Sequence, residues 1–536
     1  MRPSESVDTV DNRATFLGHP AGLFLLFFVE MWERFSYYGM RGILVLYLTS
    51  PLTGMRNPAP GSPEGFNPGP EWTDAAANNA YGWYTGLAYL TPILGGMIAD
   101  KLIGTHRSMV IGGLLIALGH LMLGICGLPA LEHSAYGMTV FVFGLSLIVI
   151  GTGHFKPSVS VMVGQLYKQG DPRRETAFGI FYMGINLGAA LQVYVVGTLG
   201  ELVGWHWGFG AAAVGMLLGL AAYVAIRPQL LEGIGLPPRK TGWTTAVLFI
   251  PVGILISALV AVGFHQGWLL KFDTFVSNQL VVAVLGGLAL AWAAWFTVQQ
   301  RPEDRGPVLS IFIFMLFNAV FWLSFEQAGS SINIFTDRHT ERMIGSYQVP
   351  TTWFQSINPW LIIVFAPITG VMWTWLSKRH ANPSQPYKIS IGLIFVGLGY
   401  LFMVWAAMQA TDGRKAAMWL IAANYFVATM GEIVLSPTGL SYVTKAAPKE
   451  HTSLLMGVWF ISSFIANLGA GKVAAMVEPI LEGKQKLPWH LASPPDGPNT
   501  QADFFLLFVI TSCAAGLLIF AFGPWLKRLT GGRDSY

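Results

Sequence analysis

Four ionisable side chains lie close together within a long apolar run near the start of the chain. They are Glu30, Glu33, Arg34 and Arg41. A charge at the centre of a bilayer costs roughly 2.5–3.5 kcal/mol on insertion scales, so such residues usually face a bundle interior or an aqueous path. Buried carboxyl groups can bind and release protons, and charges of both signs can hold a charged solute. We therefore expect this run to carry function.

The spacing of these residues places them on one side of a helix. Positions i, i+3, i+4, i+7, i+8 and i+11 share a helical face, and they are occupied by Glu30, Glu33, Arg34, Tyr37, Tyr38 and Arg41. The opposite face is expected to contact lipid and comprises Phe24, Leu25, Phe28, Met31, Trp32 and Phe35.

Few other charges fall within apolar runs. They are Lys156 in the first half of the chain and Glu326, Glu432 and Lys472 in the second. We expect Lys472 to extend to the outer interface. The first half then contributes a formal charge of +1 and the second −2, a dipole that suits a zwitterion and not a sugar. At least one carboxylate lacks a basic partner, and burial disfavours its charged form, which makes it a candidate proton carrier.

The composition is that of an integral membrane protein. Of 536 residues, 53% are hydrophobic and only 11% are charged, with a mean hydropathy of +0.51; soluble proteins carry about 25% charged residues. The two cysteines, Cys126 and Cys513, suggest neither a disulfide framework nor a thiol metal site. The histidines, His154 among them, show no metal-ligand spacing, and no cleavable signal peptide is evident.

About fourteen runs are long enough to cross a bilayer of roughly 30 Å. With a cytoplasmic N-terminus, the cytoplasmic segments hold twenty of the 32 lysines and arginines, the outer segments eight and the helices four. This asymmetry predicts that both termini are cytoplasmic. The runs lie near 21–49, 76–101, 107–128, 136–164, 175–197, 205–226, 242–264, 275–297, 307–335, 350–377, 389–410, 416–444, 452–478 and 502–526.

Two linkers rich in proline and basic residues, at 227–240 and 301–307, divide these runs. They predict an N-terminal tail at 1–20, a six-helix bundle at 21–228, an inserted helical hairpin with its linkers at 229–305, and a second six-helix bundle at 306–536. Related halves of this kind are typical of secondary transporters, whose substrate site lies near the midplane.

Several motifs resemble those of the proton-dependent oligopeptide transporter family, a branch of the major facilitator superfamily. The segment EMWERFSYYG at 30–39 is similar to the ExxERFxYYG motif of that family, and GGMIADK at 95–101 with Arg107 resembles the superfamily loop between helices two and three. Further similar segments are GTGHFKP (151–157), FYMGINLG (181–188), FWLSFEQAGSS (321–331), QSINP (355–359) and GEIVLSPTGL (431–440). The two-helix insert fits bacterial members.

The resemblance implies an all-α major facilitator fold of fourteen helices and import of di- and tripeptides together with protons. It implies that Arg41 and Lys156 bind the peptide carboxylate and that Glu432 binds the amine, with the help of Asn186 and Asn358. The remaining implied pocket residues are Tyr37, Tyr38, Tyr84 and Trp459, the last with Phe460.

The resemblance also assigns roles in coupling and gating. Glu30, Glu33 and Arg34 would form with Lys156 the cluster that senses protonation. Arg41 and Glu326 would form the bridge that closes the outer side, and Asp100 and Arg107 would form a conformational latch. The chain departs from mammalian members, which have a histidine where Gly82 aligns and a large outer domain where 410–415 forms only a turn.

Structural roles remain open for each of these residues. Glu33 and Arg34 can hold helices in register, Asn186 and Asn358 can form interhelical hydrogen bonds, and the tyrosines can serve packing. The same fold can also carry another solute, such as nitrate or a peptide-like drug. The sequence contains no HExxH or GxSxG motif that would indicate an enzyme.

The remaining expectations concern surroundings and partners. We expect a multi-pass protein of the bacterial inner membrane that functions as a monomer in lipid, with peptides and protons as its partners and with no cofactor, metal or nucleic acid. Side-chain preference among peptides, proton stoichiometry, the carboxylate that carries the proton and the resting conformation do not follow from the sequence.

Overall fold

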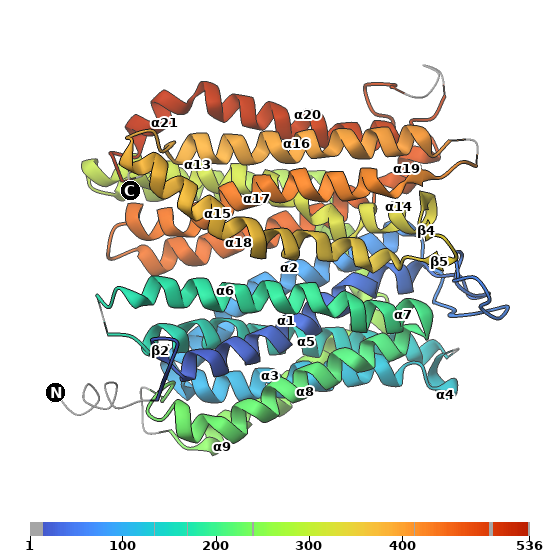
Figure 1. The fold of residues 1–536 in the computed structure, drawn as a ribbon, viewed down its shortest axis with the longest axis horizontal. Helices are drawn as coiled ribbons and strands as arrows, with labels where there is room; N and C mark the ends of the chain where they lie inside the picture. Colours follow the sequence, from blue (N-terminus) through green and yellow to red (C-terminus); the bar gives the residue numbers. More distant parts are fainter. Residues whose placement is uncertain are drawn as a thin grey trace. The chain divides into compact units, whose positions relative to one another are not determined.

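The computed structural model describes residues 14–132, 134–168, 170–237, 241–411, 413–491 and 497–533. Residues 1–13 of the predicted tail, and Arg239 and Lys240 of the first linker, lie outside this range. The described chain is almost entirely helical (Figure 1), as the predicted all-α class requires. Its strands are two-residue pairs: β1 (Thr15–Phe16) with β2 (His19–Pro20), β3 (Thr340–Glu341) with β6 (Ala416–Ala417), and β4 (Met343–Ile344) with β5 (Tyr347–Gln348).

The chain forms two compact units. The first comprises 1–70 and 87–266, and the second 71–86 and 267–536. Helix α2 (Asp74–Ile98) is shared, because its residues up to Gly86 belong to the second unit. The predicted boundaries at 228 and 306 stay predictions.

The helices of the first unit, besides the end of α2, are α1 (Gly22–Thr49), the π-helical turn η2 (Ala99–Ile103), α3 (Thr105–Ile125), α4 (Pro129–Glu132), α5 (Ala135–Gln165), α6 (Arg173–Gln192), the π-helical turn η3 (Val193–Gly197), α7 (Thr198–Leu202), α8 (Trp205–Leu230), α9 (Trp243–Val247) and α10 (Phe249–His265).

The helices of the second unit, besides the start of α2, are α11 (Trp268–Val276), α12 (Gln279–Gln299), α13 (Pro302–Phe325), the 3-10 turn η4 (Glu326–Gly329), α14 (Ser331–His339), the 3-10 turn η5 (Thr351–Ser356), α15 (Ile357–Lys378), α16 (Gln385–Gln409), α17 (Met418–Ala446), α18 (Thr452–Ala474), α19 (Val477–Leu481), α20 (Gln501–Ala521) and α21 (Gly523–Leu529).

Thirteen helical segments of the described chain are long and apolar enough to cross a membrane. Each overlaps one of the predicted runs. The first predicted run, 21–49, coincides with α1, which is long enough at 28 residues but is not among the thirteen. Every 18-residue window of α1 contains at least three of Glu30, Glu33, Arg34 and Arg41, which exceeds the charge allowed for such a segment. The predicted count of fourteen is therefore not confirmed.

Helix α1 is buried on nearly all sides, with 22 of its 28 residues buried. The prediction that Phe35 and Leu25 contact lipid is wrong, since they are 6% and 5% exposed. A Cβ atom at Gly215 of α8 would lie 2.7 Å from the Phe35 ring, and one at Gly219 would lie 2.8 Å from Trp32. Small residues on α8 thus bring that helix against the aromatic face of α1.

Helices α3 and α5 also approach through glycines. A Cβ atom at Gly112 would lie 2.6 Å from the carbonyl oxygen of Gly151, and one at Gly151 would lie 2.7 Å from the oxygen of Gly112. The pair Gly119 and Gly144 repeats this reciprocal approach. Because contact between helices in lipid depends on van der Waals packing, such glycines set how closely the two backbones meet. Their approach fixes the position of α5, which carries Lys156.

The second unit contains an ion pair that the sequence did not predict. Lys472 of α18 was expected to extend to the outer interface, but its Nζ pairs with Oδ1 of Asp273 on α11. The indole Nε1 of Trp83, on the start of α2, donates to the same oxygen at 2.6 Å. Asp273 lies in the connection predicted between the runs 242–264 and 275–297, and nothing in the sequence places that connection beside α18. Through these two contacts Asp273 joins α11, which lies between the two helices of the inserted hairpin, to α18 and α2.

The glycine contact between α3 and α5 predicts a marked asymmetry between two identical substitutions. Gly112→Ala should lower the free energy of unfolding by about 1–3 kcal/mol, because the new methyl group meets backbone atoms that cannot move aside. Gly210→Ala on α8 is the matched control, since a Cβ atom there meets nothing within 4 Å and alanine favours the helix. Thermal unfolding in detergent measures both. Equal melting temperatures would contradict the packing described here.

Candidate functional site: buried charges in each unit

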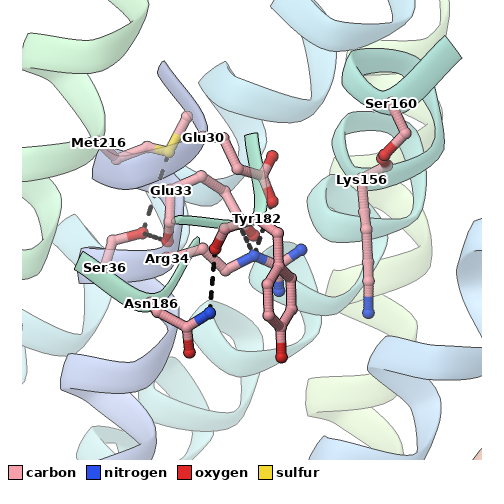
Figure 2. A network of polar contacts seen from close by, with 9 residues as sticks. All are labelled: Glu30, Glu33, Arg34, Ser36, Lys156, Ser160, Tyr182, Asn186 and Met216. Atoms are coloured by element: carbon pink, nitrogen blue, oxygen red, sulfur yellow. Dashed lines mark hydrogen bonds and ion pairs between the residues drawn. The ribbon is translucent and has the colours of Figure 1, made fainter. Parts of the chain in front are cut away.

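A cluster of three buried charges lies at the middle of α1 (Figure 2). The Nε of Arg34 lies 2.8 Å from Oε1 of Glu30 and 3.1 Å from Oε2 of Glu33. The three residues are 5%, 1% and 0% exposed, respectively. One guanidinium group therefore pairs with two carboxylates, and the predicted face of α1 is formed as the spacing required.

The backbone of α6 lies directly against this cluster. A Cβ atom at Gly188 would clash with the carbonyl oxygen of Met31 and would lie 3.0 Å from Cβ of Arg34. The amide Nδ2 of Asn186 donates to the carbonyl oxygen of Tyr182 at 3.0 Å, one turn earlier on α6 (Figure 2). Gly188, the last residue of the segment at 181–188, therefore allows α6 to pack against α1. The side-chain nitrogen of Asn186 is hydrogen-bonded within its own helix.

Three carboxylate oxygens of the cluster are buried and accept no hydrogen bond from the described residues. They are Glu30 Oε2 and both oxygens of Glu33, of which Oε2 lies 3.1 Å from Nε of Arg34. Arg34 can balance one of the two negative charges, so the three residues together carry a formal charge of −1. A buried carboxylate with an unused oxygen and an excess of negative charge beside it is chemically suited to take up a proton.

The other basic groups predicted in the first unit lie against aromatic rings. Lys156 of α5 places its Nζ 3.9 Å from the centre of the Tyr89 ring, and Arg41 lies 5.6 Å from that of Tyr38. The rings of Tyr37 and Tyr38 meet edge to face at 5.3 Å. Tyr89 was missed in the sequence, because a cation over a ring on another helix leaves no spacing pattern.

The second unit brings together two of the predicted binding residues, Asn358 and Glu432. Nδ2 of Asn358, at the start of α15, donates to Oε2 of Glu432 on α17 at 2.7 Å and to Oγ1 of Thr429 at 3.0 Å. Glu432 is 6% exposed. Its neighbour Gly431 faces Gly392 of α16. A Cβ atom at Gly431 would lie 2.7 Å from the carbonyl oxygen of Gly392. This close approach fixes the part of α17 that presents Glu432.

The remaining predicted residues of the second unit are also buried. Glu326 begins η4 and is 3% exposed, Trp459 of α18 is 7% exposed, and Tyr84 on the first half of α2 is 4% exposed. Each therefore lies inside the protein, and their pocket and gating roles stay predictions.

The predicted latch residues do not pair with each other. Asp100 lies in η2 and is exposed. Arg107 donates to the carbonyl oxygens of Thr241 at 2.7 Å and of Gly242 at 3.2 Å, and its guanidinium lies 5.3 Å from the Trp243 ring centre. Arg107 thus ties the start of α3 to the segment that precedes α9. Its gating role stays a prediction.

Comparison with known proteins decides the family. A family model described as the POT family matches residues 106–489. The chain belongs to the POT family. The major facilitator fold predicted from the motifs is confirmed by the solved structures described next, whereas the roles of individual residues stay predictions.

The relatives and solved structures cover nearly the whole chain. A peptide transporter of Yersinia enterocolitica is 34% identical over 87% of this chain and 89% of its own length. A di-/tripeptide transporter of Lactococcus lactis is 32% identical over 96% and 98%. The crystal structure of peptide transporter POT in complex with sulfate is 33% identical, with a TM-score of 0.76 over 96% and 97%. A POT family transporter in complex with 5-aminolevulinic acid is 27% identical, also with a TM-score of 0.76, over 97% and 99%.

Among the described residues, no group of three or more histidine, cysteine, aspartate or glutamate side chains is arranged to hold a metal ion.

The cluster on α1 predicts that Arg34 is essential for stability. Arg34→Gln should lower the free energy of unfolding by about 3–5 kcal/mol, because it leaves two buried carboxylates without a counter-charge. The double variant Arg34→Gln, Glu33→Gln removes one charge of each sign and should recover part of the loss. Thermal unfolding in detergent provides the measurement. If Arg34→Gln unfolds at the wild-type temperature, the ion pairs do not hold this cluster.

Proposed function

We propose that this protein is a proton-coupled symporter that imports di- and tripeptides by alternating access. The observation that carries the proposal is the buried Glu432 carboxylate, oriented by Asn358. A carboxylate kept inside the protein beside an amide is a site for an ammonium group. The names of the relatives from Yersinia and Lactococcus support a peptide as the source of that group.

The distribution of charge supports a zwitterionic substrate. In the first unit, Arg41 and Lys156 are basic. In the second unit, Glu326 and Glu432 are acidic, and Lys472 is already paired with Asp273. We assign the peptide carboxylate to Arg41 and Lys156 and the peptide amine to Glu432. The residues that we assign to the walls of the peptide site are Tyr37, Tyr38, Tyr84, Asn186, Asn358 and Trp459.

Coupling follows from the two buried carboxylates of the cluster on α1, which share Arg34. In the proposed cycle a proton neutralises Glu30 or Glu33 while the peptide is bound. Neutralisation weakens the attraction between that carboxylate and the nearby cations, Arg34 and Lys156. The bridge between Arg41 and Glu326 then closes the outer side, and the cytoplasmic side opens.

The proton gradient supplies enough free energy for this cycle. One proton gains roughly 2.3 kcal/mol per 100 mV of membrane potential and about 1.4 kcal/mol per pH unit. Together they support a gradient of a neutral peptide of about several hundred-fold per proton. We also propose that the protein lies in a bacterial inner membrane with both termini in the cytoplasm and acts as a monomer. No observation favours nitrate or a drug as the substrate.

The direct test is uptake of labelled dialanine into proteoliposomes, with and without an inward proton gradient and membrane potential. The proposal predicts accumulation that collapses when a protonophore is added. If a correctly folded sample shows no uptake and dialanine does not bind, the peptide assignment is overturned.

Removal of the charge at Glu432 should abolish the amine site. Glu432→Gln keeps the size of the side chain but not its charge, so dialanine binding and uptake should be lost. Binding to detergent-purified protein provides the measurement, and a wild-type melting temperature shows that the variant is folded. Unchanged uptake would contradict the amine-binding role of Glu432.

Lys156→Ala should separate transport from its driving force. Without the ammonium group, protonation of the cluster on α1 no longer releases a cation, so gradient-driven accumulation should be lost. Exchange of labelled for unlabelled dialanine needs no net proton movement and is expected to remain. Full accumulation by Lys156→Ala would exclude a coupling role for this residue.

A further inference from the structure

We infer that Thr429 is a positioning residue that fixes the orientation of the Asn358 amide and thereby makes the site selective for a free amine. This inference rests on the proposed function, since it concerns how Glu432 and Asn358 recognise a peptide amine. Thr429 lies three residues before Glu432 on α17, so the two side chains share a face of that helix. Thr429 is fully buried, with 0% of its surface exposed.

The hydroxyl group of Thr429 can only accept a hydrogen bond from Asn358, because its hydrogen is already used. Its Oγ1 donates to the carbonyl oxygen of Tyr425 at 2.6 Å. A threonine hydroxyl has one hydrogen and two lone pairs, so this bond uses its only donor. Toward Asn358, which lies 3.0 Å away, the hydroxyl oxygen can only accept. An amide in contact with it must therefore present its NH₂ group.

Glu432 imposes the same demand on the other hydrogen of that group. Its ionised carboxylate has no donor, and its Oε2 accepts from Nδ2 of Asn358 at 2.7 Å. The two hydrogens of Nδ2 are thus both used, one by Thr429 and one by Glu432. If the amide were flipped, its oxygen would face two acceptors at once, so one orientation is strongly preferred.

This orientation leaves two oxygen atoms for a ligand. Among the hydrogen bonds of the described residues, none is accepted by Oδ1 of Asn358 or by Oε1 of Glu432. They belong to side chains that are joined to each other through Nδ2 and Oε2. An ammonium group has three donors and no acceptor, so a pair of acceptors that includes a carboxylate suits it. A hydroxyl group has only one donor and gains less from the same pair.

Without Thr429, the amide loses one of its two fixed partners. One of the two N–H groups of Nδ2 then lacks an acceptor, which favours rotation of the amide or its displacement from Glu432. The second acceptor for the amine is lost in that fraction of molecules. The consequence is reduced preference for a free amine, and not a general loss of binding.

The test compares two ligands in three forms of the full-length protein. The ligands are dialanine and lactoyl-alanine, in which a hydroxyl group replaces the terminal amine. The proteins are wild type, Thr429→Val, which keeps the shape but removes the hydroxyl, and Thr429→Ser, which keeps the hydroxyl. Inhibition of labelled dialanine uptake into proteoliposomes gives the affinity for each ligand, and initial rates give KM and kcat separately.

The inference predicts that Thr429→Val lowers the preference for dialanine over lactoyl-alanine by roughly five- to tenfold. The loss should fall on the KM for dialanine, with kcat nearly unchanged, and Thr429→Ser should behave as wild type. If Thr429→Val does not fold, Thr429→Ala carries the same comparison, since it also lacks the hydroxyl.

Three results would overturn the inference while the proposed function stands. The first is a Thr429→Val variant with the wild-type preference for dialanine, and the second is an equal loss of affinity for both ligands in that variant. The third is a Thr429→Ser variant whose preference for dialanine falls as far as that of Thr429→Val. If the wild-type protein itself binds the two ligands equally, or does not transport dialanine, the amine site proposed for Glu432 fails and this inference fails with it.

Discussion

A charged side chain inside a membrane protein must find its counter-charge within the protein, because lipid offers none. In this chain α1 meets that constraint with one arginine between two glutamates, and with burial of 22 of its 28 residues. The arrangement places two carboxylates on one arginine and leaves three carboxylate oxygens without a hydrogen bond from the described residues. The same feature that makes the cluster costly to bury also gives it a reason to bind a proton.

The helices around the charges are positioned largely by residues without side chains. Gly188 brings α6 against Met31 and Arg34, Gly215 and Gly219 seat α8 on the aromatic face of α1, and Gly431 brings α17 toward α16 beside Glu432. At Gly188 and Gly431 the nearest atoms are backbone oxygens, which cannot move aside to accept a larger residue. We infer that the charged side chains depend on this packing for their separation and orientation.

The sequence predicted the features that arise within one helix or one motif. The face of α1 from Glu30 to Arg41 follows from helical spacing, and most spans follow from hydropathy. Contacts between distant segments were not predictable in this way. The pairing of Lys472 with Asp273, the ring of Tyr89 beneath Lys156, and the hydroxyl of Thr429 beside Asn358 each join residues that no spacing rule connects. The lipid-facing role expected for Phe35 was wrong for the same reason, since only tertiary structure shows that α8 covers it.

The central claim is that the buried carboxylates exchange protons when a peptide binds. The most direct measurement is proton uptake by the purified protein when dialanine is added in weakly buffered solution, followed with a pH-sensitive dye across the neutral pH range. The account predicts that protons are taken up together with the peptide, in an amount that depends on the starting pH. Dialanine binding with no proton uptake at any pH would contradict it.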